Sequence, residues 1–245
     1  MRPDQPLGHQ AAIRPRRGRG GDPLDQATRD RLAQFPVCDL ADAVGRLYTL
    51  DAAIRPLASG MPKLIGTAVT AKAAPGDNWA IHAALSLVKA GDVVVVDWLG
   101  YHTGCGTGVS STVPAIRQGL AGIVIDGGWR DVDELAALGV PVHGRARTPF
   151  SPPKRDLGEV NVPVHCGGVV VEPGDVIVGE VDGTVCIPRW ALADVLAEAK
   201  PTQIRARLDQ FENDPLADVV RATQQRYWAE FERRGGIDLT KGTQL

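Results

Sequence analysis

The chain has few aromatic residues, few cysteines and no long apolar run, and each shortage narrows what the protein can be. Phe, Trp and Tyr together make up 5% of its 245 residues, whereas hydrophobic residues as a whole reach 44%. The core must therefore be built from small and β-branched side chains, which is typical of α/β proteins. The four cysteines include no Cys-x-x-Cys pair, which argues against a thiolate metal site and favours a reduced, cytoplasmic protein. No apolar stretch approaches the roughly 20 residues that cross a bilayer.

A large excess of charge of either sign is also missing. The formal net charge is −2 at pH 7, which gives no general attraction to nucleic acid or to an anionic membrane. Residues 1–22 are a local exception, because they are rich in Arg, Gly and Pro. They have no apolar stretch after their charges, so a secretory signal is not expected. We interpret residues 1–22 as a disordered basic arm, with a nucleic-acid contact as the alternative left open.

The rest of the chain shows two sequence patterns in succession. Between residues 64 and 143 the segments LIGTAVTAKA, DVVVVDWLG and AGIVID are predicted strands that alternate with helices. From residue 161 the sequence NVPVHCGGVVVEPGDVIVGEVDGTVCIP predicts short strands separated by Gly-Gly, Pro-Gly-Asp and Asp-Gly turns. The first pattern predicts parallel strands and the second predicts a β-meander, so we expect one α+β body over residues 23–200. Residues 201–245 are predicted to form a helical extension, with helices near 203–212 and 215–234.

Two polar, glycine-rich stretches directly follow predicted strands. The first is Tyr-His-Thr-Gly-Cys-Gly-Thr-Gly at 101–108, which we expect to be a loop after Asp97. The second is Asp126-Gly127-Gly128, which leads into Trp129, Arg130 and Asp131. Ligands of open α/β sheets bind beyond the carboxyl ends of the strands. If the two strands are neighbours, both stretches face one pocket.

The side chains and amides of these stretches suit a small anionic substrate. A helix is predicted to begin near residue 110, so the N–H groups of Ser110 and Ser111 can bind a carboxylate. Arg130 offers a planar fork to the same anion, and Asp131 is a hard oxygen ligand for Mg²⁺. Such a site could hold a 2-oxo acid and stabilise its enolate. The alternative is structural: Arg130 and Asp131 could be only a helix cap beside a surface salt bridge, and the glycine-rich loop only a turn.

With these residues in view, the sequence resembles the RraA-like family, which includes class II pyruvate aldolases of 4-hydroxy-4-methyl-2-oxoglutarate and regulators of ribonuclease activity. The resemblance covers roughly residues 36–190, and its most specific string is Gly-x-x-Gly-x-Val-x-Asp-Gly-x-x-Arg-Asp, ending at Asp131. Further strings that carry it are DAAIRPL, GTAVTAKAAPGDNWAIHAAL, GDVVVVD and the meander segment quoted above.

The resemblance implies a swivelling β/β/α fold, to which the predicted C-terminal helices are an addition. It also implies self-association into a trimeric or hexameric ring, with active sites between subunits. It places Arg130 on the pyruvyl group and Asp131 on Mg²⁺ or Mn²⁺. The substrate carboxylate would lie on the backbone from Gly108 and Val109 to Ser110 and Ser111.

One position departs from the aldolases of this family. They carry an acidic residue, directly after a glycine, where this chain has Val109 after Gly108. That acid helps to place the water that protonates the enolate, and a valine cannot do so. His102 is the replacement acid or base that we consider first, because its ordinary pKa suits proton transfer. Other candidates are the strand-end acids and two weaker side chains: Asp97, Asp126, Tyr101 and Cys105.

Two functions follow as hypotheses. The first is a divalent-metal-dependent carbon–carbon lyase on a small 2-oxo acid, acting by aldol cleavage or by decarboxylation of an oxaloacetate-type substrate. The second is a non-catalytic ring protein that binds and regulates a protein partner such as a ribonuclease, with which Val109 is compatible. A methyltransferase is set aside, because no Gly-x-Gly-x-x-Gly loop follows a predicted strand. Neither nucleic acid nor a membrane is an expected partner.

Overall fold

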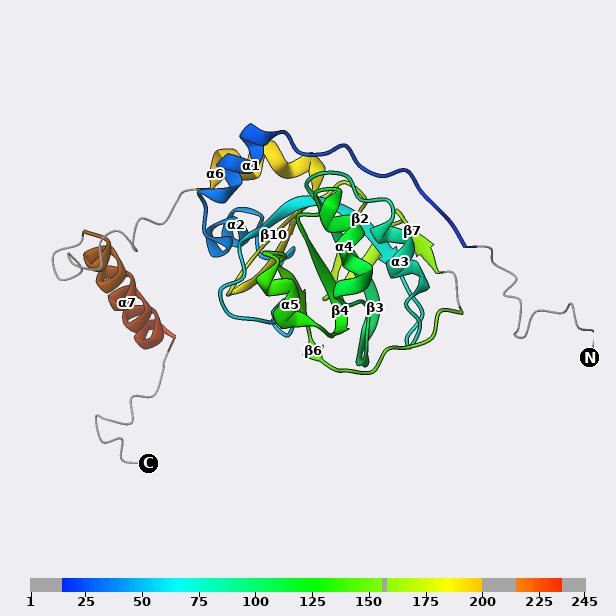
Figure 1. Ribbon diagram of the computed structural model, residues 1–245. Coiled ribbons are helices and arrows are strands. Elements are labelled where there is room, and N and C mark those ends of the chain that lie inside the picture. Colours follow the sequence, from blue (N-terminus) through cyan, green and yellow to red (C-terminus); the bar gives the residue numbers. More distant parts are fainter. Residues whose placement is uncertain (1–14, 156–157, 200–214, 235–245) are drawn as a thin grey trace, which may run out of the picture. The chain divides into compact units, whose positions relative to one another are not determined.

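The computed structural model of the chain describes residues 15–155, 158–199 and 215–234 (Figure 1). The chain divides into two compact units, residues 1–201 and residues 202–245. The first unit contains every strand described below, and the second contains one described helix, α7 (Pro215–Arg233). The helix predicted at 203–212 lies outside the described residues.

The body is built on one mixed sheet of nine strands. Its central strands are parallel and consecutive in the chain: β2 (Leu64–Lys72), β3 (Asp92–Cys105), β4 (Gly122–Trp129) and β5 (Val142–Gly144). Antiparallel strands extend it beyond β2, namely β10 (Val176–Glu180) and then β11 (Gly183–Ile187). Short strands complete it, with β1 (Arg55–Pro56) on β5, β6 (Ala146–Arg147) on β4 and β7 (Glu159–Val160) on β2. The α+β fold with parallel strands and a meander is thus confirmed.

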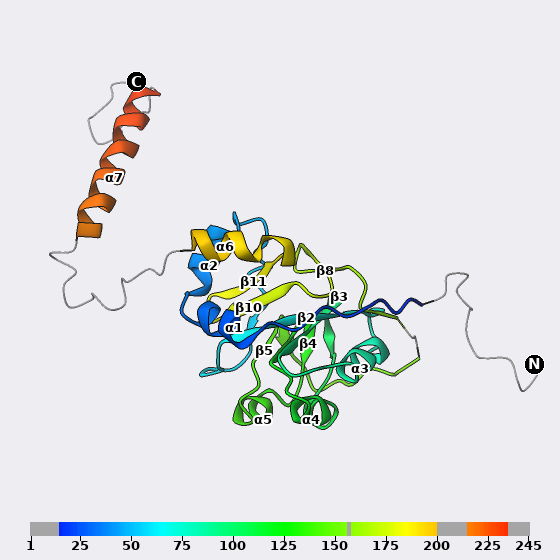
Figure 2. The same ribbon diagram turned by 90° about the horizontal axis from the view of Figure 1, so that it is seen from above.

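Helices and a small hairpin cover the two faces of this sheet. Figure 2 shows α3 (Trp79–Leu85), α4 (Val109–Arg117) and α5 (Val132–Ala137), which connect the parallel strands, together on one face. The hairpin of β8 (Val164–Cys166) and β9 (Val169–Val171) packs on the other face. A third apolar cluster joins β10 and β11 to α1 (Gln26–Ala33), α2 (Val37–Ala43) and α6 (Leu192–Glu198). Because both faces are covered, Val93–Val96 of β3 are fully buried.

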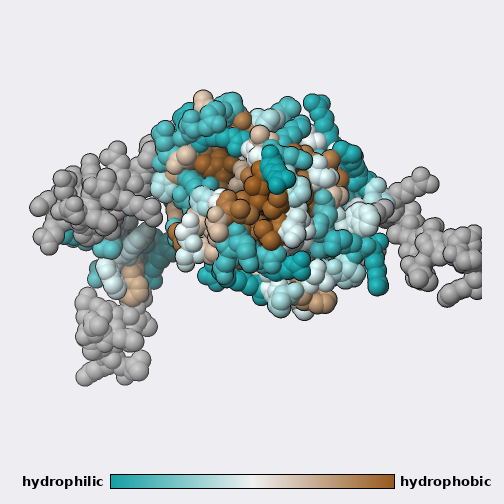
Figure 3. All heavy atoms as spheres, viewed as in Figure 1, coloured by the Kyte–Doolittle hydropathy of each residue, from teal (hydrophilic) through white to brown (hydrophobic). Residues whose placement is uncertain are grey.

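The surface on the side of α3, α4 and α5 is not uniformly polar. Figure 3, in the view of Figure 1, shows apolar residues gathered near the middle of this side with hydrophilic residues around them. Val109 and Ile116 of α4 are among the half-buried apolar residues that pack on the core below. Among the described residues, no helix is long and apolar enough to cross a membrane.

The predicted loop at 101–108 is the main correction to the sequence analysis. Strand β3 continues to Cys105, with register shifts on either side of Tyr101, so only the last residues of this stretch are a loop. The glycines are needed for close approach of two backbones. A Cβ on Gly127 would lie 2.5 Å from the Tyr101 carbonyl oxygen, and one on Gly128 would lie 2.5 Å from that of Gly104.

Part of the predicted N-terminal arm lies along the body. The Gly18 N–H donates to the Val160 carbonyl at 2.9 Å, and Arg16 pairs with Glu159 at 2.6 Å. Residues 15–22 are therefore not a disordered segment as the sequence analysis had them. Residues 1–14 of that arm lie outside the described residues.

Candidate functional site

The site is centred on Arg130 and Asp131, where β4 ends and α5 is about to begin. Their side chains are half exposed, at 37% and 31%, and the Arg130 Nε lies 3.6 Å from the Asp131 Oδ2. Asp131 has a φ of +54°, a left-handed conformation that is uncommon outside glycine and costs free energy. The chain therefore turns sharply here and presents both charged groups at the carboxyl end of β4.

Asp131 does not act as an ordinary helix cap. It occupies the N-cap position of α5, but its carboxylate accepts no hydrogen bond from that helix. Instead, Oδ2 accepts the backbone N–H of Val109 at 3.0 Å, at the start of α4. The structural alternative of a cap beside a salt bridge therefore holds only in part: Asp131 is at the N-cap position and pairs with Arg130, but its carboxylate makes no capping hydrogen bond and reaches toward the start of α4.

Gly108 lies directly against both charged groups. A Cβ at this position would stand 2.3 Å from the Asp131 Oδ2 and 2.8 Å from the Arg130 Nε. The backbone of Gly108 is extended, with a φ of −144°, so its conformation does not require glycine. Glycine is needed here for the space that it leaves to Arg130 and Asp131.

The amides predicted to bind an anion lie at the start of α4, and their binding of an anion stays a prediction. Helix α4 begins at Val109, so the N–H groups of Ser110 and Ser111 lie in its first turn and have no hydrogen-bond partner among the described residues. The N–H of Val109 is different, because Asp131 already accepts it. Val109 was expected to help bind the substrate carboxylate, and its amide cannot do so while this bond lasts.

The buried part of the Arg130 guanidinium lies near the thiol of Cys105. Its Nε is buried and has no hydrogen-bond partner among the described residues. Cys105 lies close by: burial raises the pKa of its thiol, and the nearby Arg130 only partly opposes that shift. The raised pKa keeps Cys105 protonated, so it is a poor nucleophile and places no thiolate beside Arg130 that would compete with an anionic ligand.

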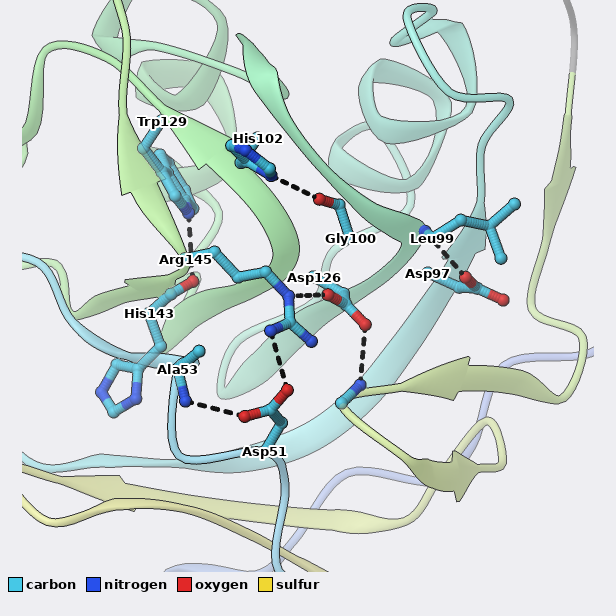
Figure 4. A network of polar contacts seen from close by, with 11 residues as sticks. Asp51, Ala53, Asp97, Leu99, Gly100, His102, Asp126, Trp129, His143 and Arg145 are labelled. Atoms are coloured by element: carbon cyan, nitrogen blue, oxygen red, sulfur yellow. Dashed lines mark hydrogen bonds and ion pairs between the residues drawn. The ribbon is translucent and has the colours of Figure 1, made fainter.

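An open hollow of about 490 Å³ adjoins these groups. Its walls come from the end of β4, the first turn of α5, and the end of β6 with the stretch that follows it. Its lining residues are Trp129, Arg130, Asp131, Val132, Asp133, Glu134, Arg147, Thr148 and Pro149. Trp129 is a packing residue in this wall. It is fully buried, and its Nε1 donates to the His143 carbonyl at 3.0 Å (Figure 4).

His102 lies on the irregular second half of β3 and is exposed. Its Nδ1 is 3.0 Å from the Gly100 carbonyl oxygen of the same strand (Figure 4). The recorded hydrogen bond of His102 thus goes to its own strand and not to Arg130 or Asp131. Its part as an acid or base stays a prediction.

The two strand-end acids have structural partners. The Asp97 Oδ2 accepts the N–H of His165 at 3.2 Å, and the Asp126 Oδ2 accepts the N–H of Gly167 at 2.9 Å. Arg145 binds the other oxygen of Asp126 and also Asp51, the latter at 2.8 Å (Figure 4). Asp97 and Asp126 therefore hold the β8–β9 hairpin on the sheet, and neither is a free acid or base for chemistry.

The residues present fit a divalent cation in one limited way. Asp131 offers Oδ1, which has no hydrogen-bond partner among the described residues. Within the described residues there is no group of three or more His, Cys, Asp or Glu side chains that could hold a metal. Mg²⁺ commonly takes one or two protein carboxylates and fills its other positions with water and substrate oxygens. Asp131 would hold such an ion as its single carboxylate from this chain.

Comparison with known proteins identifies the family of this chain. The family model "RraA-like: Aldolase/RraA" matches residues 37–186. The chain belongs to the RraA-like family. A relative in Halalkalibacterium halodurans, named "Putative 4-hydroxy-4-methyl-2-oxoglutarate aldolase", is 37% identical over 183 residues, which cover 74% of this chain and 87% of the relative.

Two solved structures show the same RraA-like fold. The RNA-processing inhibitor RraA of Thermus thermophilis is 29% identical, with a TM-score of 0.57 over 62% of this chain and 92% of its own. RraAS2 of Streptomyces coelicolor, described as an unusual member of the RNase ES inhibitor RraA protein family, is 28% identical. Its TM-score is 0.63 over 86% of this chain and 97% of its own. The family thus includes relatives named for aldol chemistry and others named for inhibition of RNA processing.

Proposed function

We propose that this protein is a divalent-metal-dependent carbon–carbon lyase that acts on a 2-oxo acid by aldol cleavage or oxaloacetate-type decarboxylation. The observation that carries the proposal is the pair Arg130–Asp131. Both side chains remain half exposed beside a hollow, a strained backbone holds Asp131, and Gly108 leaves the space that they occupy. Relatives named for 4-hydroxy-4-methyl-2-oxoglutarate aldolase activity support the same class of reaction.

In the proposed reaction, Arg130 binds the pyruvyl end of the substrate, and the free N–H groups of Ser110 and Ser111 bind its carboxylate. The bond between C3 and C4 breaks, and its electron pair moves through C3 into the C2 carbonyl to give an enolate. In decarboxylation C4 leaves as carbon dioxide. In aldol cleavage the C4 hydroxyl gives its proton to water, and C4 leaves as the carbonyl carbon of a second oxo acid. A divalent cation held by Asp131 would supply charge stabilisation at that oxygen. Arg130 stabilises the same developing charge. C3 then takes up a proton, from water or from His102, and pyruvate leaves.

Val109 affects the last step, in which C3 takes up a proton. Its side chain is half buried against the α3–α5 core and has no group that can move a proton. Water therefore has no carboxylate of this helix to orient it, and we expect proton delivery to C3 to limit the rate.

The direct test is pyruvate release from oxaloacetate with Mg²⁺ or Mn²⁺, measured by a coupled NADH assay. The rate without enzyme at the same metal concentration is subtracted. Asp131→Asn should lower the rate by about 100-fold or more, because it removes the only carboxylate that we assign to the ion. Glu198→Gln, an exposed acid on α6, is the matched control and should leave the rate unchanged. No release with either ion, or full activity in Asp131→Asn, would contradict the proposal.

A non-catalytic role is the second candidate, favoured by the valine at position 109 and by the relatives named as inhibitors. It predicts inert kinetics together with stoichiometric binding of a protein partner such as a ribonuclease. Assembly into a trimer or hexamer stays a prediction in both cases.

A further inference from the structure

We propose that Arg147 binds the distal carboxylate of a dicarboxylic 2-oxo acid and thereby selects dicarboxylates over monocarboxylates. The inference rests on the proposed function, because it assumes that Arg130 and Asp131 hold the pyruvyl end of the same molecule. It assigns a role to a residue outside the motif that ends at Asp131.

Arg147 lies beside Arg130 at the ends of two adjacent strands. In the parallel ladder of β4 and β6, Arg147 is the register partner of Trp129, the residue before Arg130. The N–H of Thr148 donates to the Trp129 carbonyl at 2.7 Å and continues this pairing. Neighbouring strands lie about 4.8 Å apart, and both arginines line the same hollow. Two guanidinium groups thus face one space from adjacent backbones.

The contacts of Arg147 orient its guanidinium and leave donors free. Nε donates to the Leu57 carbonyl at 3.0 Å, Nη2 donates to the same oxygen, and Nη1 donates to the Asp133 Oδ1 at 3.1 Å. A guanidinium has five N–H donors, so two remain for a ligand. The side chain is 48% exposed. The Leu57 carbonyl therefore fixes the plane of the Arg147 guanidinium, and an accessible edge of this group is left for a carboxylate.

The nearby Arg145 shows what a purely structural arginine looks like in this stretch. Its guanidinium is bound by two carboxylates, Asp126 and Asp51, and its side chain is only 21% exposed. Arg147 has one carboxylate partner, Asp133, which is itself 82% exposed. An exposed ion pair of this kind is weak, so a substrate carboxylate in the hollow can compete with Asp133.

The hollow is also large enough for a second carboxylate. Its volume of about 490 Å³ falls in the range of small-molecule sites, and a three-carbon pyruvyl group fills only part of such a space. Arg130 provides for one anionic end, and Arg147 is a further cation on its wall.

The test compares two ligands of equal chain length by calorimetry in the presence of Mg²⁺. 2-Oxoglutarate has a distal carboxylate, and 2-oxopentanoate lacks it. We expect the protein to bind 2-oxoglutarate about tenfold more tightly, as a charge-assisted hydrogen bond predicts. Arg147→Gln should abolish this preference while the dissociation constant for 2-oxopentanoate stays the same. Asp133→Asn, which removes the competing carboxylate, should keep or widen the preference.

The outcomes separate this inference from the proposed function. If both ligands bind but Arg147→Gln weakens them equally, Arg147 only supports the site and the inference fails alone. It also fails alone if the protein binds both ligands equally well. If the protein binds neither ligand with any divalent ion, the proposed function falls and the role of Arg147 falls with it.

Discussion

Asp131 connects the ends of two neighbouring strands, because it follows β4 and its carboxylate binds the backbone at the start of α4, after β3. Its backbone is in the left-handed region, which is uncommon outside glycine and is held only where the surroundings determine it. Its carboxylate turns away from the helix that it precedes and accepts the Val109 N–H. The strained backbone and the long-range hydrogen bond support our proposal that Asp131 binds a ligand.

Gly108→Ala is a residue-scale test of this geometry. The added methyl group would stand 2.3 Å from the Asp131 Oδ2, so the carboxylate must move. We expect pyruvate release to fall by about tenfold or more, since small displacements of a catalytic group are costly. Urea unfolding should show a free energy close to that of the unmodified protein, because the Gly108 φ of −144° suits alanine. Unchanged activity would show that Asp131 can move without consequence.

Part of this site could be predicted from the sequence. Adjacent Arg130 and Asp131 after a buried strand, followed by a short helix, can be inferred from local pattern alone. The bond from Val109 to Asp131 cannot, because it depends on how the start of α4 is placed against the end of β4. The roles of Asp97 and Asp126 were missed for the same reason, since their partners lie on the distant β8–β9 hairpin.

At the scale of elements, glycine content was the least reliable predictor of secondary structure. Glycine-rich sequence near residue 104 predicted a loop, yet the structure has the irregular end of a strand there. The alternation of parallel strands with α3, α4 and α5 was predictable, because apolar runs and helical patterns follow each other locally. The pairing of β10 with β2 joins segments roughly a hundred residues apart, and no local signal specifies it.

Helix α4 offers an element-scale prediction. Pro114 lies inside this helix, beyond its first turn, and is exposed. It has no N–H to donate to the Ser110 carbonyl, and proline in a helix interior costs up to about 3 kcal/mol. Pro114→Ala should therefore raise the free energy of unfolding, by about 1–3 kcal/mol, in urea titration followed by circular dichroism. A fall in stability would mean that the proline ring contributes packing that outweighs the missing hydrogen bond.

At the scale of the whole molecule, the body has its own core. Three apolar clusters surround the sheet, and their buried members among the described residues all lie between Leu24 and Ala199. Helix α7 belongs to the second unit, where the side chains of Tyr227 and Trp228 are exposed. A compact unit with a complete core is expected to fold by itself.

A chain that ends at residue 200 tests this independence. Its melting temperature should agree with that of the full chain to within about 2 °C, because no buried member of the three clusters is removed. Differential scanning calorimetry on both chains provides the comparison. A decrease of more than about 5 °C would show that the second unit stabilises the first.

The hydrogen bond from the Val109 N–H to Asp131 has one further consequence. A cation that took Oδ2 of Asp131 as well as the free Oδ1 would release this N–H at the start of α4, where it would join those of Ser110 and Ser111 in attracting a carboxylate. The two binding equilibria are then linked, and linkage is reciprocal. The ion would tighten the acid by the same factor as the acid tightens the ion, so the two would fill the site together.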